Sequence, residues 1–245
     1  MENSLEVKNL TKYYGSFKLS DVSFNIPLGG IVGLVGANGA GKTTTLNLIQ
    51  NIIRKDNGEV LFFGKPSEDR IPQNVAVVAD NIYYEKGWKV SELNKIVKRF
   101  YDNWNQAEFE RLIEKFALDK SKAIGQLSKG MSIKLMIAVA LSRNARLLIL
   151  DEPTSGLDPI ARDELCGILL DFVSDKTKSV LFSTHITSDL EKIADDVVFL
   201  VNGEIRLNDK KDNIIRKFSN DELKTLDDII IHLHEKEGVR YEKDA

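Results

Sequence analysis

The segment Gly36–Thr43 constrains this chain more than any other, because it fits the pattern G-x-x-x-x-G-K-[ST]. It follows the apolar run Ile31–Val35, so the pattern predicts a buried strand, a glycine loop and a helix that begins at Gly41. Glycines let backbone N–H groups turn inward around phosphate oxygens, and the helix start adds a positive dipole. The alternative is an ordinary glycine turn before a helix. We expect a nucleoside triphosphate to bind here, with Lys42 on its β- and γ-phosphates and the Thr43 hydroxyl on Mg²⁺.

Bulk properties limit the class of protein. With 245 residues the chain can hold one α/β domain and a smaller lobe. The net charge of −3 offers no basic surface, so no nucleic-acid partner is expected. A single cysteine, Cys166, cannot form an internal disulfide, which is typical of a reducing compartment. The sequence shows no signal pattern and no apolar run of membrane length, so we expect a cytoplasmic protein that reaches a membrane through a partner.

Apolar patterns divide the chain into parts. Runs that predict strands begin at Leu5, Val22, Ile31, Gly58, Val75, Leu147, Ser179, Val197 and Glu204. Strands that alternate with helices indicate a parallel sheet, and Thr43–Ile53 is expected to be the helix after the glycine loop. The expected parts are a core of residues 1–87 and 145–207, a helical subdomain of residues 88–144 and a charged tail of residues 208–245. Within the tail, Leu223–Leu233 predicts a short amphipathic helix that packs on its own domain or docks a partner.

Paired carboxylates follow a second buried run. Leu147–Leu150 is continuously apolar, as in a strand buried on both faces, and Asp151 and Glu152 come directly after it. Ligands of open α/β sheets bind at the carboxyl ends of the strands. We therefore expect Asp151 to hold Mg²⁺ and Glu152 to polarise an attacking water as a general base. The alternative is a charged turn after a core strand.

Further motifs complete a set that is specific to one family. Leu127–Met131 lies upstream of the carboxylate strand, Ser155–Asp158 follows it, and His185 comes after the apolar strand Leu181–Thr184. In this order, over the span Leu5–Leu207, the chain resembles the nucleotide-binding subunit of ATP-binding cassette (ABC) transporters. The resemblance implies an α/β P-loop NTPase fold, with a RecA-like parallel-sheet core that binds ATP, an antiparallel β subdomain and an inserted α-helical subdomain.

The resemblance also implies roles for individual residues around the nucleotide. The implied phosphate cradle consists of Asn38, Gly39, Ala40, Gly41, Lys42, Thr43 and Thr44. The implied catalytic residues are Lys42, Glu152 and His185, where His185 is similar to the switch histidine that hydrogen-bonds the γ-phosphate. Tyr14 is similar to the aromatic residue that stacks on adenine, and Tyr13 is an alternative for this role. The other interpretation is that the tyrosine only packs in the core from an edge strand.

Other implied roles concern a second subunit. Ser128 and Gly130 resemble the signature motif, which contacts the γ-phosphate of ATP bound to the other subunit. A serine hydroxyl and glycine N–H groups at the start of a helix suit an anion. Asp158 resembles the loop residue that communicates across the dimer.

Two departures from the family pattern have consequences. Lys129 and Met131 replace residues of the common Leu-Ser-Gly-Gly-Gln signature, and this form resembles bacterial exporter subunits that pair with ABC-2 type permeases. A glutamine of the family pattern, which reaches Mg²⁺ and the attacking water, is replaced by Asp80. A carboxylate accepts hydrogen bonds but cannot donate them as an amide does. We therefore expect Asp80 to bind Mg²⁺ directly or through water, with Thr43 and Asp151.

The leading expectation is an ATP-binding and hydrolysing subunit of a bacterial ABC transporter, with export as the expected direction. Two copies would dimerise around Mg·ATP and drive a separate integral membrane permease, which places the protein at the inner face of the cell membrane. The alternatives are a soluble ABC ATPase outside transport and a regulatory ATP-binding module. Neither a kinase nor a GTPase explains Leu127–Met131 or His185.

Overall fold

A six-stranded sheet forms the centre of the molecule. The computed structural model describes residues 2–67, 70–79, 83–218 and 223–236. The sheet contains β3 Ile31–Val35, β6 Val75–Val78, β7 Leu147–Asp151, β8 Ser179–Thr184, β9 Asp196–Val201 and β10 Glu204–Lys210. The strand order is β10-β9-β3-β8-β7-β6, and neighbours are parallel from β9 to β6, whereas β10 pairs antiparallel with β9.

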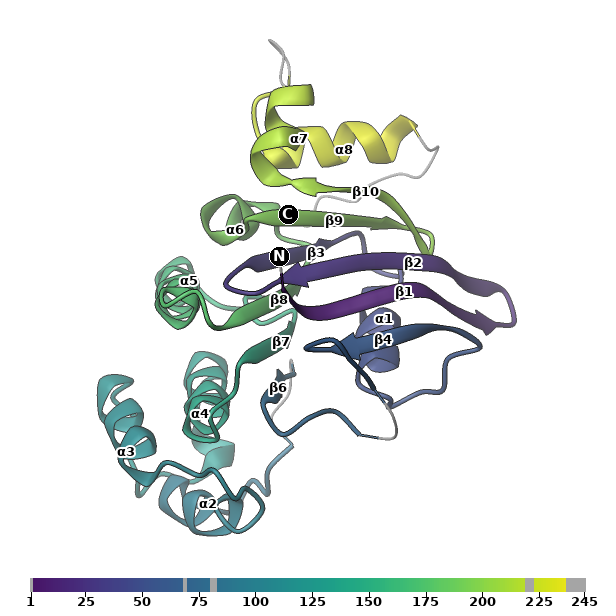
Figure 1. The fold of residues 1–245 in the computed structure, drawn as a ribbon. Helices are drawn as coiled ribbons and strands as arrows, with labels where there is room; N and C mark the ends of the chain where they lie inside the picture. The colour runs from purple at the N-terminus through teal and green to yellow at the C-terminus, as the bar shows by residue number, and fades with distance from the viewer. Residues whose placement is uncertain (1, 68–69, 80–82, 219–222, 237–245) are drawn as a thin grey trace.

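A four-stranded antiparallel sheet lies beside the first (Figure 1). It contains β1 Asn3–Tyr14, β2 Phe17–Pro27, β4 Asn57–Phe62 and β5 Lys65–Pro66, in the order β2-β1-β4-β5. Along β2, Val22, Phe24 and Ile26 are buried while the residues between them are exposed. This alternation places one face of the strand in the core, because successive side chains of a strand point to opposite faces.

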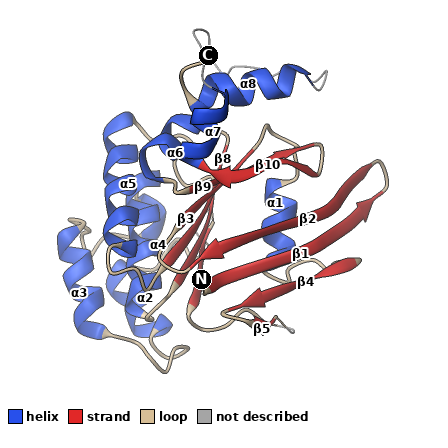
Figure 2. Ribbon diagram, turned by 45° about the horizontal axis from the view of Figure 1, so that its top comes forward, coloured by secondary structure: helices blue, strands red, loops and turns tan. Residues whose placement is uncertain are grey.

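Helix α1, Lys42–Ile49, lies between the two sheets (Figure 2). Leu46 and its apolar neighbours are buried in a cluster that contains side chains of both sheets. The predicted helix Thr43–Ile53 is wrong at its end. Asn51 has a left-handed φ of 57°, and a right-handed helix cannot continue through this conformation. The side-chain amide of Asn51 donates to Ser67 Oγ at 2.7 Å.

Helices lie on the other side of the parallel sheet, where α4 Lys129–Ser142, α5 Pro159–Val173 and α6 Thr187–Ile193 contact its strands (Figure 1). The helical insertion also contains α2 Val90–Val97, α3 Gln106–Lys115 and a 3₁₀ turn Ile124–Gln126, and α3 packs on α4. Their apolar side chains and one face of the sheet form a single cluster of buried residues. A parallel α/β sheet with an antiparallel sheet and a helical insertion is the fold class that the sequence predicts, and it is confirmed.

Two helices follow β10. They are α7 Lys211–Phe218 and α8 Leu226–Lys236, and α8 contacts both α6 and α7. Leu226, Ile229 and Ile230 of α8 are fully buried, so this helix packs its apolar face on its own chain. None of the helices in the described ranges has the length and hydropathy that a bilayer crossing requires.

Candidate functional site

The glycine loop connects β3 to α1 through a backbone that an L side chain would strain. Gly39 has a φ of 82°, and Gly41, the N-cap of α1, has a φ of 110°. A Cβ on Gly41 would lie 3.0 Å from Leu19 Cδ1 and 3.1 Å from Phe17 Cζ. Glycine is therefore required at this position both by its dihedral angles and by the space around it.

A cavity of about 400 Å³ opens on this loop. Its lining residues are Phe17, Ala37, Asn38, Gly39, Gly41, Lys42, Thr43, Thr44 and Glu152. Most of the phosphate cradle expected from the sequence therefore faces one cavity, at the N-terminal end of α1. The partial positive charge of a helix start and a lysine at the same place favour an anionic ligand.

Lys42 links the loop to the carboxylate strand. The Lys42 side chain is buried, and its Nζ donates to the carbonyl oxygens of Gly36 at 2.7 Å and Ala37 at 3.3 Å. The same Nζ lies 3.2 Å from Glu152 Oε1. The ammonium group is thus paired with a carboxylate of the same chain.

Glu152 is also in contact with His185, at the end of β8. His185 Nδ1 lies 2.8 Å from Glu152 Oε2, and the backbone N–H of His185 donates to the same oxygen at 3.3 Å. Glu152 has a left-handed φ of 48°, which is uncommon for a residue with a side chain. The structure therefore brings the three expected catalytic residues, Lys42, Glu152 and His185, within hydrogen-bond distance in one chain.

Asp151 offers a carboxylate oxygen that suits a divalent cation. Thr43 Oγ1 donates to Asp151 Oδ2 at 3.2 Å, whereas Asp151 Oδ1 is buried and has no hydrogen-bond partner among the described residues. Burial raises the pKa of Asp151, and the Thr43 hydroxyl opposes this shift. A buried carboxylate oxygen without a donor is well matched to Mg²⁺.

Among the residues that the structure describes, the ligand set for such a cation is incomplete. In the described part of the chain, no group of three or more His, Cys, Asp and Glu side chains is arranged to hold a metal ion. Mg²⁺ commonly binds through one or two protein groups together with phosphate oxygens of a substrate. The pair Thr43 and Asp151 fits that mode of binding. The expected Mg²⁺ ligand Asp80 lies outside the described residues.

The signature residues lie away from this cavity. Ser128 is exposed at the N-cap of α4, where its Oγ accepts a hydrogen bond from the Met131 backbone N–H at 3.2 Å. A Cβ on Gly130 would lie 3.7 Å from Leu157 Cδ2 and 3.8 Å from Ala161 Cβ, so the start of α4 packs on the start of α5. Neither Ser128 nor Gly130 is among the residues that line the phosphate-loop cavity.

Asp158 is placed at the start of α5. Its Oδ1 accepts hydrogen bonds from the backbone N–H groups of Ile160 and Ala161, each at 3.0 Å. These are N-cap contacts, and Pro159 at the first helical position strengthens the same helix start. Asp158 therefore has a local structural role in this chain, in addition to the role across a dimer that the resemblance implies.

The aromatic residues near the loop differ from the expectation in one respect. Tyr14 and Tyr13 are both exposed, with Lys12 Nζ 5.6 Å from the Tyr14 ring centroid and Lys18 Nζ 5.3 Å from that of Tyr13. Neither tyrosine lines the cavity, whereas Phe17 does. Sequence reasoning missed Phe17. The signal that could have found it is its position at the start of β2, directly across the hairpin from Tyr14.

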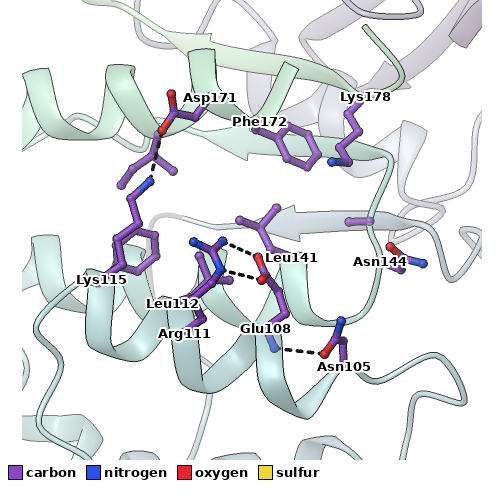
Figure 3. A pocket seen from close by; sticks show the side chains of 13 residues that line it. Asn105, Glu108, Arg111, Leu112, Lys115, Leu141, Asn144, Asp171, Phe172 and Lys178 are labelled. Carbon is purple, nitrogen blue, oxygen red and sulfur yellow. Dashed lines mark hydrogen bonds and ion pairs between the residues drawn. The ribbon is translucent and has the colours of Figure 1, made fainter. Parts of the chain in front are cut away.

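A second cavity, of about 310 Å³, lies among α3, α4 and α5 (Figure 3). Four of its charged groups form two pairs: Arg111 Nη2 lies 2.7 Å from Glu108 Oε1, and Lys115 Nζ lies 3.1 Å from Asp171 Oδ2. None of the expected site residues lines it. The phosphate-loop cavity therefore remains the candidate nucleotide site.

Comparison with known proteins agrees with this geometry. A model of the ABC transporter family matches residues 19–155. The ABC transporter ATP-binding protein YtrB of Bacillus subtilis (strain 168) is 32% identical over 200 residues, which are 80% of this chain and 68% of that protein. The lantibiotic transport ATP-binding protein SrtF of Streptococcus pyogenes is 32% identical over 222 residues, which are 88% and 96% of the two chains.

A solved structure of an ATP-binding subunit of an ABC transporter has the same fold. Its TM-score to this chain is 0.81 at 30% sequence identity, and the match covers 94% of this chain and 98% of that one. The glycine loop, the carboxylate strand and the signature motif thus occur in a fold shared with this family. The chain belongs to the ATP-binding proteins of the ABC transporter family.

Proposed function

We propose that this chain is the ATP-hydrolysing subunit of a bacterial ABC transporter. The observation that carries the proposal is the contact of Lys42, Glu152 and His185 beside the cavity of the glycine loop. An ammonium group, a carboxylate and an imidazole at this spacing are the groups that phosphoryl transfer from ATP to water uses. Membership in the ABC transporter family supports the same reaction.

ATP bound at the glycine loop would compete with Glu152 for Lys42. The backbone N–H groups of Asn38–Thr44 would surround the phosphates at the positive end of α1. Lys42 would leave Glu152 for the β- and γ-phosphates, because both are stronger anionic partners for a single ammonium group. Arrival of the nucleotide thereby frees the Glu152 carboxylate. Tyr14 is the proposed stacking partner of adenine, and Phe17 is a second candidate.

Hydrolysis would then depend on the released carboxylate. Glu152 accepts a proton from water as the water oxygen attacks the γ-phosphorus and ADP leaves. His185 holds the geometry of this water and hydrogen-bonds the γ-phosphate. Thr43 and Asp151 would hold Mg²⁺, whose charge offsets that of the phosphates, and Asp80 is a further proposed ligand from the sequence pattern.

The complete site would need a second subunit. Ser128 and Gly130, which lie away from the cavity of their own chain, would contact the γ-phosphate held by the other copy, and a homodimer is the simplest assembly. The exposed position of Ser128 supports this arrangement.

The transport role rests on relatives. The names of the SrtF and YtrB relatives support a role in transport. The signature residues Lys129 and Met131 support a partner permease of the ABC-2 type and export. The protein would then be cytoplasmic and peripheral on the inner face of the membrane.

The test of this proposal is hydrolysis by Glu152→Gln. We expect kcat to fall by about 10²–10⁴-fold with ATP binding retained, because the amide cannot accept the proton. Glu164→Gln, a change of the same kind at an exposed residue of α5, is the matched control and should hydrolyse as the wild type does. Unchanged phosphate release by Glu152→Gln would show that another group is the base.

Two further outcomes separate the alternatives. A wild-type protein that binds ATP but releases no phosphate would favour the regulatory module. Co-purification with ribosomes or DNA in place of an integral membrane protein would favour a soluble ABC ATPase outside transport.

A further inference from the structure

A buried ion pair connects the two helices that begin at the motif loops. Asp189 lies on α6, four residues after His185, and is 3% exposed. Arg162 lies on α5, four residues after Asp158, and donates to Asp189 Oδ2 from its terminal nitrogen at 3.2 Å and from Nε at 3.4 Å. The pair thus joins the first turns of the two helices.

The burial of this pair makes it different from surface ion pairs. Side-chain exposure is 4% for Asp189 and 23% for Arg162, so the carboxylate is removed from water and the guanidinium is half-buried. Loss of Arg162 would leave the Asp189 charge buried and uncompensated. A second pair, Lys192 with Asp163 at 2.6 Å, joins the same helices, but both of its side chains are mostly exposed. Exposed pairs of this kind contribute little.

Helix α6 depends on such tertiary contacts for its position. It has seven residues and no side-chain hydrogen bond at its N-cap, Ile186. On its other side, Thr187 Oγ1 donates to Asp227 Oδ1 of α8 at 2.7 Å, and the Leu226 backbone N–H donates to the Glu191 carboxylate. A short helix without a local cap is held by its neighbours, and Arg162 holds it from α5.

We propose that Arg162 and Asp189 are positioning residues for ATP hydrolysis, which rests on the function proposed above. Their ion pair fixes the start of α6, and with it His185, relative to the loop Ser155–Asp158 at the start of α5. Only Ile186 separates His185 from α6, so a shift of the helix start moves the imidazole. The ion pair would thereby couple two positions: that of Asp158 at a second subunit and that of His185 at the γ-phosphate.

The test uses the full chain with Mg·ATP and the variant Asp189→Asn, which keeps the shape of the side chain and removes its charge. We expect kcat to fall about tenfold or more, while KM for ATP changes less than about twofold, because the glycine loop is untouched. Asp163→Asn removes the same charge from the exposed pair and should leave kcat within about twofold of the wild type. Arg162→Lys keeps a positive charge and should give an intermediate kcat.

Each outcome supports or overturns the inference. Equal kcat values for Asp189→Asn and Asp163→Asn would overturn it. A loss of kcat that simply parallels the fall in the thermal midpoint of unfolding across all the variants would also overturn it. If Asp189→Asn does not fold, Arg162→Lys decides: a lowered kcat at unchanged KM and thermal midpoint supports the inference, and wild-type kcat overturns it. A wild-type protein without hydrolysis would instead refute the proposed function, so the two failures are distinguishable.

Discussion

The phosphate-loop half and the signature half of the proposed site differ in how far one chain completes them. At the phosphate loop, Lys42 and His185 both contact Glu152 within one chain. At the start of α4, the Ser128 hydroxyl caps its own helix and Gly130 packs on α5. The first half is a set of reactive groups that meet at Glu152, and the second is a helix start whose serine is exposed. The difference supports the proposal that one chain carries half of a composite site and presents the other half to a second molecule.

The largest expected effect comes from the phosphate-loop half. Lys42→Met removes the ammonium group that contacts Glu152 and the loop carbonyls, so both nucleotide binding and hydrolysis should be lost, with kcat reduced about 10²-fold or more. Phosphate release and binding of a fluorescent ATP analogue measure the two effects. Retained hydrolysis would mean that Lys42 does not serve the phosphates.

Changes in the signature half should act on assembly and spare the fold of one chain. Ser128→Asp keeps a side chain that caps α4, because Asp and Ser are similar N-caps, but it adds negative charge where a phosphate would bind. We expect hydrolysis to fall about tenfold or more. Binding of ADP to the monomer, measured by titration calorimetry, should stay unchanged.

The N-cap of α3 offers the matched control. Asn105 Oδ1 accepts a hydrogen bond from the Glu108 backbone N–H at 3.0 Å, so Asn105→Asp makes a similar change at another helix start. Its kcat should equal that of the wild type. Equal losses for Asn105→Asp and Ser128→Asp would remove the distinction between the two halves.

Two glycine substitutions, one in each half of the site, should change stability in opposite directions, with smaller effects than the changes above. Gly41→Ala forces an L side chain into a φ of 110° and toward Leu19, and should lower the free energy of unfolding by about 1–3 kcal/mol. In Gly130→Ala the added Cβ makes ordinary van der Waals contacts inside a helix, so the free energy of unfolding should rise by up to about 1 kcal/mol. Hydrolysis by the same variant should fall. Urea denaturation and phosphate release together measure both. A Gly130→Ala protein with normal hydrolysis would argue against a contact at this glycine.

Local patterns predicted much of this molecule. The apolar runs Ile31–Val35 and Leu147–Leu150 are buried central strands, because continuous apolar sequence is what a strand covered on both faces requires. The glycine pattern likewise predicted a loop at the start of α1. The structure then places Lys42, Glu152 and His185 together, which their motifs suggested without giving distances.

Other features could not be read from the sequence, since they depend on contacts between distant segments. The early end of α1 follows from the backbone of Asn51 and its contact with Ser67. The ion pair of Arg162 with Asp189 joins two helices that no periodic pattern relates. The position of Phe17 beside the glycine loop depends on how the antiparallel sheet packs on α1. Each of these is a tertiary contact, which single-sequence propensity does not encode.

The central claim is that the phosphate loop of one chain faces Ser128 of another, and cross-linking tests it most directly. Chains with Ser128→Cys are mixed with chains with Asn38→Cys, each also carrying Glu152→Gln and Cys166→Ser, so that a disulfide between the two new cysteines joins two molecules. With Mg·ATP the account predicts a disulfide-linked dimer of these two chains, and without nucleotide mostly monomers. Monomers alone under both conditions, with ATP bound at the phosphate loop, would contradict the account.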